Sequence, residues 1–262
     1  MSLARYNLLI DLNGTCHIAD NPTPGAVQAI EKLRAAQQRQ PNRIDIRFCS
    51  NTSKESSHSL LSRLRRVGFG PDLVSSRDVF TSLDAAHRYV SCRQLRPLLL
   101  LSPSAQSVFK DDKHLASTCF FACADIDPEN LDSDDNHRLR SRNAVVIGLC
   151  PVAAFGRTGE YGADEQVALI ATLRALYHRS SEGAALLMGP GAFVAALEAA
   201  SLCCASSTTV CGKPSQALLQ ECISGMVSAN QVISDYTNII IGDDSDADLG
   251  KGTLHNLVYV GC

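Results

Sequence analysis

Near its N-terminus the chain carries Leu8-Leu9-Ile10-Asp11-Leu12-Asn13-Gly14-Thr15, a short apolar run that leads into an acid and a glycine turn. A second run with the same ending lies far away in the sequence, as Asn238-Ile239-Ile240-Ile241-Gly242-Asp243-Asp244. Short continuous apolar runs are typical of strands buried on both faces of a parallel sheet. If the two strands are neighbours, their acids meet at the carboxyl edge of the sheet, where open α/β sheets bind ligands.

The acids at the ends of these runs predict a metal site. Carboxylates gathered at one edge repel one another unless a cation lies between them, and Mg²⁺ takes oxygen ligands. The candidate ligands are Asp11, Asp243, Asp244 and Asp248. A hard cation at such a sheet edge indicates phosphate chemistry.

The apolar pattern predicts alternating strands and helices at both ends of the chain. We expect strands at residues 5–10, 43–49, 208–211, 236–241 and 257–260. Helices are expected to open at Pro24, at about Ser53, after Gly189-Pro190-Gly191 and at Pro214. Strand–helix units in series form a parallel sheet with helical crossovers. We therefore predict a doubly wound α/β core made of residues 1–82 and 187–262.

The middle of the chain predicts an inserted domain at residues 83–186. Residues 98–101, 119–124 and 143–148 are expected to be strands, and residues 164–178 a helix. Residues 125–135 carry six acids, but the position where an EF-hand loop needs glycine is Asn130. We interpret this acidic run as a solvated insertion.

Composition excludes several classes of partner. The net charge of −3, the 5% of aromatic residues and the absence of Trp argue against nucleic acid and against an anionic membrane surface. No apolar run approaches the roughly 20 residues of a membrane-spanning helix, and no signal peptide is visible. The eleven cysteines form no zinc-type CxxC pairs, so we expect reduced core thiols in a cytoplasmic protein.

Four groups occur in the order that phosphoryl transfer to an aspartate requires. Asp11 can act as the nucleophile. Ser50 and Asn51, at the end of the second strand, can donate hydrogen bonds to phosphate oxygens. Lys213, between a strand and a helix N-terminus, can neutralise the nucleophile and the phosphate together. The acids of the last apolar run supply the metal side, and phosphoryl transfer needs mainly such positioning and charge neutralisation.

These motifs resemble those of the haloacid dehalogenase superfamily, in the subclass (IIA) with a large α/β cap, called C2, inserted between the second and third motifs. The run Arg47-Phe48-Cys49-Ser50-Asn51-Thr52-Ser53-Lys54-Glu55-Ser56 fits one branch of these hydrolases, as do Phe80-Thr81-Ser82 and Gly189-Pro190-Gly191-Ala192-Phe193. The resemblance covers nearly all of the predicted core and fades in the cap. It implies a Rossmann-like core, Mg²⁺ as cofactor, and hydrolysis of a small phosphorylated molecule, phosphoramidate or pyrophosphate through phospho-Asp11.

The resemblance also implies roles for the residues around the phosphoryl group. Ser50 and Asn51 would hold that group, and Lys213 would bridge it to the nucleophile. Gly14 would let the chain turn closely at the phosphate.

A further set of roles concerns the metal. Asp11 would be a Mg²⁺ ligand as well as the nucleophile, and Asn13 would offer its backbone carbonyl. Asp243 would bind Mg²⁺ directly, while Asp244 and Asp248 would act on the metal or its waters.

One departure from the family pattern bears directly on catalysis. Most family phosphatases carry Asp where this chain has Asn13, and that acid protonates the leaving group and then activates water. Asn cannot transfer protons, and loss of a general acid/base costs about 10²–10⁴-fold in rate. The related branch also tends to lack this acid, so we expect a preference for good leaving groups, as in N–P bonds, acid anhydrides or aryl phosphates.

Other departures lie in the cap and at the end of the sequence. His178 and Arg179 are candidate substrate contacts in a cap segment that fits the family poorly, so specificity does not transfer from relatives. His17, just past the first motif, is a further candidate for the lining of the site. Family members continue beyond the position of Val260, whereas this sequence stops at Cys262, and we expect apolar sheet surface to be exposed there.

Two other functions stay open at this point. Because of Asn13, the chain could be a catalytically weak or silent homologue that binds Mg²⁺ and phospho-ligands as a regulatory or scaffold protein. A receiver-type phospho-acceptor domain also pairs acids with a lysine, but the long interval before Lys213 argues against it. A homodimer formed through the cap is a further expectation from the resemblance.

Overall fold

The chain forms two compact units in the computed structural model, which describes residues 4–117, 119–121, 142–149, 168–179, 186–200, 208–224, 226, 236–249 and 257–262. The first unit comprises Met1–Asn51, Ser57–Thr81 and Lys213–Cys262, and the second comprises Thr52–Ser56 and Ser82–Gly212. Both ends of the chain therefore contribute to the first unit.

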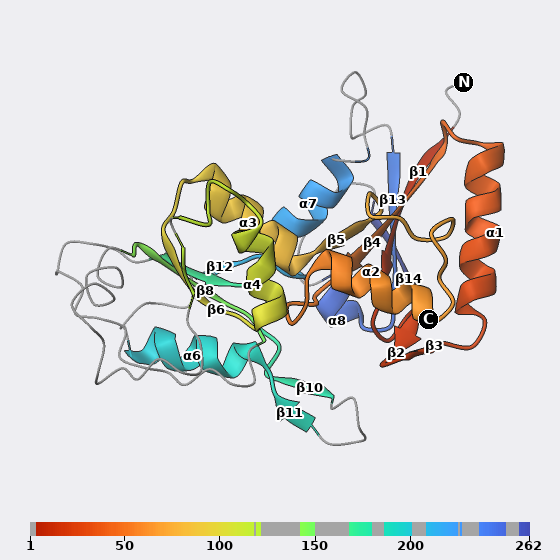
Figure 1. The fold of residues 1–262 in the computed structure, drawn as a ribbon. Coiled ribbons are helices and arrows are strands. Elements are labelled where there is room, and N and C mark those ends of the chain that lie inside the picture. The colour runs from red at the N-terminus through yellow and green to blue at the C-terminus, as the bar shows by residue number, and fades with distance from the viewer. Residues whose placement is uncertain are drawn as a thin grey trace. The chain divides into compact units, whose positions relative to one another are not determined.

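A five-stranded parallel sheet forms the centre of the first unit, in the order β14-β13-β1-β4-β5 (Figure 1). Its strands are β1 (Arg5–Asp11), β4 (Ile44–Ser50), β5 (Val79–Thr81), β13 (Tyr236–Gly242) and β14 (Leu257–Gly261). The chain moves from β1 in one direction through β4 to β5, and it returns on the other side of β1 through β13. The winding thus reverses between β1 and β13, and the crevice at such a switch point is where these sheets bind ligands.

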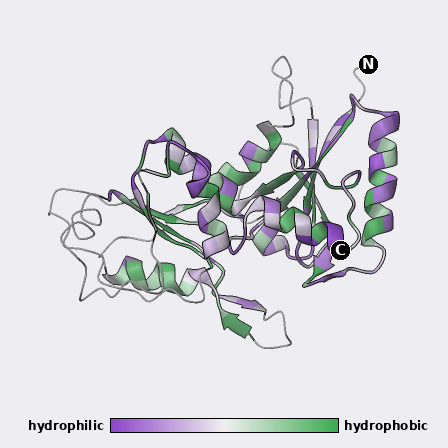
Figure 2. Ribbon diagram, viewed as in Figure 1, coloured by the Kyte–Doolittle hydropathy of each residue, from purple (hydrophilic) through white to green (hydrophobic). Residues whose placement is uncertain are grey.

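Helices cover both faces of this sheet. Ile30 of α1 (Ala26–Arg39) and Leu60 of α2 (Ser57–Arg66) join Ile10 and Phe48 in one buried apolar cluster. Cys222 of α7 (Gln216–Ser224) contacts the neighbour of Phe48 in β4, whose side chain points to the opposite face. A strand that is covered by helices on both faces is typically a near-continuous run of hydrophobic residues. In Figure 2 the strands of this sheet are coloured mainly as hydrophobic.

Two small elements complete the first unit near the ends of β1 and β13. A hairpin of β2 (His17–Ile18) and β3 (Asn21–Pro22) follows the turn after β1. The short helix α8 (Ser245–Asp248) follows β13. The hairpin contains His17 and α8 contains Asp248, both of which are predicted site residues.

The second unit has its own parallel sheet, in the order β12-β9-β8-β6-β7. Its strands are β6 (Pro97–Leu100), β7 (Phe120–Phe121), β8 (Ala144–Ile147), β9 (Ala168–Ala171) and β12 (Thr209–Val210). Among the described residues, the helices of this unit are α3 (Ser82–Cys92), α4 (Pro103–Lys110) and α6 (Pro190–Ala200). A separate hairpin pairs β10 (Tyr177–Arg179) with β11 (Leu186–Met188).

Most of the predicted elements are present, but the predicted helix at residues 164–178 is wrong. Residues 168–171 form β9, which pairs with both β8 and β12, and residues 177–179 form β10. The apolar positions at 167, 170, 173 and 177 are spaced as on a helix face, whereas a short strand buried on both faces needs no alternation. Pairing with strands distant in sequence therefore decides the structure of this segment.

The second predicted domain boundary, at residue 186, also differs from the observed division at residue 212. Val194 of α6 packs against Leu98, Val145 and Leu169 in the second unit, and β12 pairs with β9 of the same sheet. A Cβ on Gly191 would lie 2.2 Å from the carbonyl oxygen of Arg174, so the start of α6 fits closely against the chain after β9. These contacts assign residues 187–212 to the second unit.

Apolar sheet surface was expected to be exposed near Val260. Val258 and Val260 of β14 are exposed to 47% and 46%.

The remaining expectations concern the cysteines, membrane-spanning helices and the acidic run. The described cysteines, which are Cys16, Cys49, Cys92, Cys119, Cys211, Cys222 and Cys262, are all free thiols. Among the described residues, no helix has the length and apolar character needed to cross a bilayer. The acidic run at residues 125–135 lies outside the described residues.

A buried amide pair joins the two central strands, and it generates a stability prediction. Asn7 Nδ2 donates to Asn238 Oδ1 over 2.9 Å, and both residues are almost fully buried. Removing one buried partner leaves the other without its hydrogen bond, which costs about 1–3 kcal/mol, whereas apolar replacement of both can be nearly neutral. We expect Asn7→Leu and Asn238→Leu each to lower the free energy of unfolding in urea, and the double variant to lose less than their sum. Additive losses would show that the two amides are not coupled.

Candidate active site

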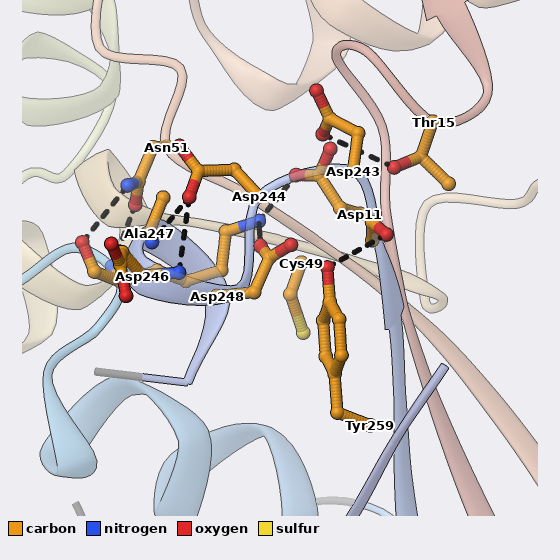
Figure 3. A network of polar contacts seen from close by, with 12 residues as sticks. Asp11, Thr15, Cys49, Asn51, Asp243, Asp244, Asp246, Ala247, Asp248 and Tyr259 are labelled. Atoms are coloured by element: carbon orange, nitrogen blue, oxygen red, sulfur yellow. Dashed lines mark hydrogen bonds and ion pairs between the residues drawn. The ribbon is translucent and has the colours of Figure 1, made fainter. Parts of the chain in front are cut away.

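A buried ion triad lies at the carboxyl edge of the first sheet, where β1 and β13 end. Lys213 Nζ donates to Asp11 Oδ1 at the end of β1 and, over 2.6 Å, to Asp248 Oδ1 in α8. The three residues are exposed to 6%, 7% and 2% respectively. Figure 3 shows the Asp11 and Asp248 side chains on the same side of the sheet edge, beside Asp243 and Asp244.

Charge and burial oppose each other in this triad. Burial raises the pKa of Asp11 to about 6, although the Lys213 ammonium favours its ionised form, and Asp248 and Asp243 add repulsion. Burial also works against the charge on Lys213, but attraction to Asp11 and Asp248 outweighs it and holds the pKa of the ammonium above its ordinary value. One lysine thus serves two carboxylates, and the site still carries excess negative charge.

The Asn51 side chain fixes the position of Lys213. The backbone N–H of Lys213 donates to Asn51 Oδ1 over 2.6 Å, and Asn51 Nδ2 donates to the Lys213 carbonyl over 3.0 Å. This reciprocal pair joins the end of β4 to the start of the last segment of the first unit. These contacts orient the backbone of Lys213. The predicted role of Asn51 in holding the phosphoryl group stays a prediction.

Asp243 lies against the glycine turn that follows β1. A Cβ on Gly14 would lie 2.2 Å from Asp243 Oδ2, and Gly14 has a φ of +101°. Thr15 Oγ1 lies within 3.4 Å of Asp243 Oδ1 (Figure 3). The turn therefore needs glycine both for its backbone conformation and for the approach of this carboxylate.

Tyr259 and Gly242 position the acids that follow β13. Tyr259 Oη donates to the Gly242 carbonyl over 2.8 Å, which fixes the strand end from which Asp243 extends. A Cβ on Gly242 would lie 1.8 Å from Asp248 Oδ2, so only glycine leaves room for that carboxylate. Neither residue was identified from the sequence, because the register between β13 and β14 is not visible in either strand alone.

Asp244 has a structural use at the same sheet edge. Its Oδ1 accepts hydrogen bonds from the backbone N–H groups of Asp246 and Ala247, over 3.0 and 3.1 Å, and so caps α8. A capping carboxylate satisfies otherwise unpaired N–H groups of the first helical turn. Asp244 thus orients the helix that carries Asp248, and its predicted role at the metal stays a prediction.

The remaining predicted residues are spread over both units. Asn13 is exposed and forms an isolated bridge with His17. The ring of His17 is buried, with Nδ1 3.0 Å from the Ala19 carbonyl oxygen and near Arg63 of α2. Ser50 is buried at the end of β4 and pairs with Thr81 of β5.

The two predicted substrate contacts of the cap, His178 and Arg179, belong to β10 in the second unit. Their role toward the site of the first unit stays a prediction.

The donor set fits a hard cation. Among the described residues, Asp11 Oδ2 and Asp248 Oδ2 are buried without a hydrogen-bond donor. No three His, Cys, Asp or Glu side chains in the described ranges already converge as a metal cage. The absence of such a cage among these residues has a geometric reason, because the Lys213 ammonium lies between the carboxylates of Asp11 and Asp248. Unsatisfied buried carboxylate oxygens beside Asp243 are suitable ligands for Mg²⁺.

Comparison with known sequences yields clear relatives. The sequence model of the haloacid dehalogenase-like hydrolases matches residues 8–112. The human haloacid dehalogenase-like hydrolase domain-containing protein 2 is 34% identical over 261 residues, which cover 97% of this chain and 84% of that protein. The human phospholysine phosphohistidine inorganic pyrophosphate phosphatase is 25% identical over 244 residues, covering 93% of this chain and 77% of that protein.

Solved structures share the fold. A hypothetical protein from Pyrococcus horikoshii has a TM-score of 0.71 at 18% identity, over 94% of this chain and 83% of that one. A glycerol phosphate phosphatase from Mycobacterium tuberculosis, in complex with magnesium, has a TM-score of 0.62 at 23% identity, over 92% of this chain and 62% of that one.

The Gly14 turn generates a prediction with a matched control. Gly14 and Gly25 both have positive φ, but a Cβ on Gly25 would meet nothing within 4 Å. Alanine at either position costs about 1–2 kcal/mol of left-handed backbone strain. Gly14→Ala would also displace Asp243, and we expect Mg²⁺ affinity to fall about 10–100-fold, as for other changes that disturb ligand orientation. Titration calorimetry with Mg²⁺ and urea unfolding measure the two effects. Equal Mg²⁺ affinity in the two variants would contradict this account.

Proposed function

Because this chain belongs to the haloacid dehalogenase-like hydrolase family, we propose that it is a Mg²⁺-dependent phosphatase that works through a phospho-Asp11 intermediate. The observation that carries this proposal is the burial and hydrogen bonding of the Asp11 carboxylate. Its carboxylate is buried at the switch point of the sheet, with one oxygen held by Lys213 and the other without a donor among the described residues. A fixed carboxylate with an unsatisfied oxygen is suited to nucleophilic attack.

In the first half-reaction, an Asp11 carboxylate oxygen attacks the phosphorus atom. A bond forms between that oxygen and phosphorus, while the bond from phosphorus to the leaving group breaks. Lys213 balances the negative charge shared by the nucleophile and the phosphoryl oxygens. Asn51 holds Lys213 at the place where this charge develops.

The identity of residue 13 bears on the leaving group. Asn13 cannot donate a proton, so the departing group must be stable as an anion or already carry a proton. Phosphoramidates, pyrophosphate and aryl phosphates meet this condition better than alkyl phosphates do. The name of one relative, phospholysine phosphohistidine inorganic pyrophosphate phosphatase, includes substrates of this chemical class.

In the second half-reaction, water attacks phosphorus, the bond to Asp11 breaks, and phosphate leaves with the Asp11 carboxylate restored. The proton released by water goes to solvent or to the phosphate itself.

Asp11, Asp243 and the Asn13 carbonyl would hold Mg²⁺. When bound, the metal supplies positive charge to the phosphoryl oxygens and to the acids around them. Asp248 is paired with Lys213, and Asp244 caps α8, so we assign both a supporting role at the metal.

The second unit is proposed to act as the cap that selects the small phosphorylated substrate, with His178 and Arg179 as candidate contacts. Caps of this kind exclude bulk water during turnover. A cytoplasmic location and a homodimer stay predictions, to be checked by fractionation and by light scattering.

The proposal is tested by hydrolysis of an aryl phosphate, pyrophosphate, a phosphoramidate and an alkyl phosphate, with Mg²⁺ and with EDTA. We expect Mg²⁺-dependent turnover of the first three, and its loss in Asp11→Asn, which keeps the size of the side chain and removes the nucleophile. Asn13→Asp restores a proton donor, so turnover of the alkyl phosphate should rise by about 10²–10⁴-fold relative to the aryl phosphate.

Other outcomes have distinct meanings. Turnover that persists in Asp11→Asn would overturn the assignment of the nucleophile. A parent protein without turnover that gains it through Asn13→Asp would show an intact scaffold that serves as a binder of phospho-ligands.

A further inference from the structure

Two buried thiols meet behind the candidate active site. Cys49 Sγ donates to Cys222 Sγ over 3.1 Å, which joins β4 to α7. Cys49 is exposed to 2% and Cys222 to 0%, and both are free thiols.

Each cysteine of the pair lies on an element that is adjacent in the structure or in the sequence to residues of the candidate site. Cys49 is the register partner of Asp11 in the neighbouring strand, and it directly precedes Ser50 and Asn51. Cys222 lies in α7, the helix that follows Lys213 in the chain. A bond between the sulfurs would therefore join the strand that carries Asn51 to the helix that follows the lysine.

We propose that Cys49 and Cys222 form a reversible disulfide under oxidation, and that this bond lowers the activity of the site. Disulfides in reducing compartments are usually transient and redox-sensing. The expected effect on turnover rests on the proposed phosphatase function, whereas formation of the disulfide does not.

The oxidation balances with a hydroperoxide as the oxidant. One thiol reacts with hydrogen peroxide to give a sulfenic acid and water, as the sulfur loses two electrons to the peroxide bond. The second thiol attacks the sulfenic sulfur, the S–S bond forms, and a second water leaves with the remaining proton. A dithiol reductant reverses the bond by thiol–disulfide exchange.

The resting pair is protected rather than reactive. The adjacent Cys49 sulfur, which disfavours a negative charge beside it, and burial raise the pKa of the Cys222 thiol well above its ordinary value. The thiolate is the reactive form, and a buried sulfur meets the oxidant only when α7 moves away from the sheet. We therefore expect slow oxidation, limited by local opening of α7.

Bond formation would disturb the site through geometry. The sulfurs must approach from 3.1 Å to the bond length of about 2.05 Å, and rotation of the two side chains together with displacement of β4 or α7 covers this difference of roughly 1 Å. Misplacement of a catalytic group by 1 Å can cost about 10²-fold in rate. Because Asn51 and Lys213 flank the two moving elements, we expect turnover to fall by about tenfold to hundredfold.

Peptide mapping tests the bond without reference to activity. The folded protein is treated with hydrogen peroxide, free thiols are blocked, and the chain is cut with trypsin and a glutamyl endopeptidase. Trypsin releases Cys49 in a peptide of residues 48–54, and cleavage after Glu221 separates Cys222 from the three preceding cysteines. We expect these two peptides to be joined in the non-reduced digest and separate after dithiothreitol. Failure to find them joined would overturn the proposal, whether or not the protein is a phosphatase.

Activity measurements test the consequence. Cys222→Ala and Cys49→Ala should each keep turnover under peroxide, whereas the parent loses it and regains it with dithiothreitol. Cys92→Ser removes an exposed thiol and should behave as the parent. If either alanine variant fails to fold, the other variant and the mapped parent still decide the question. Equal inactivation of the parent and the Cys222→Ala variant would contradict the link between this disulfide and the site.

Discussion

The ion triad of Lys213, Asp11 and Asp248 is the constraint on which the rest of the site depends. Two carboxylates buried at one sheet edge are costly unless a cation lies between them, and breaking a buried pair commonly costs about 3–5 kcal/mol. The lysine supplies that cation in the folded chain, and Asn51 holds it by both backbone groups. Glycine at positions 14 and 242 leaves room for the remaining carboxylate oxygens. A nucleophile, its counter-charge and the predicted metal ligands thus come from three separate segments, around Asp11, Lys213 and Asp243, that the parallel sheet brings together.

Much of the core could be predicted from the sequence because its signals are local. Buried parallel strands appear as apolar runs, and the acids and glycines that follow them mark the ends of β1 and β13. The second unit was harder, because β9 has apolar spacing that also suits a helix and is decided by pairing with β8 and β12. The assignment of α6 depended likewise on long-range packing, which no local pattern reveals.

In the site, too, some features could be predicted from local sequence signals, whereas others depend on contacts between distant segments. Asp11, Lys213 and Asp248 could be identified by motif order, and the structure brings them together. The use of Asp244 as a helix cap and of Asn51 as a support for Lys213 could not, because both depend on which backbone groups lie nearby. Tyr259 was missed for a related reason: its hydrogen bond to Gly242 crosses between strands whose register the sequence does not specify. Motif residues can therefore be found by type, while their individual tasks follow from geometry.

The central claim is that Asp11 becomes covalently phosphorylated during turnover. The most direct measurement is mass spectrometry of the Mg²⁺-loaded enzyme, rapidly quenched in acid during hydrolysis of an aryl phosphate, with peptide mapping after reduction of acyl phosphates. The account predicts one added phosphoryl group, located on Asp11, in the parent and none in Asp11→Asn. Turnover with the phosphoryl group on another residue, or with no covalent intermediate in either protein, would contradict it.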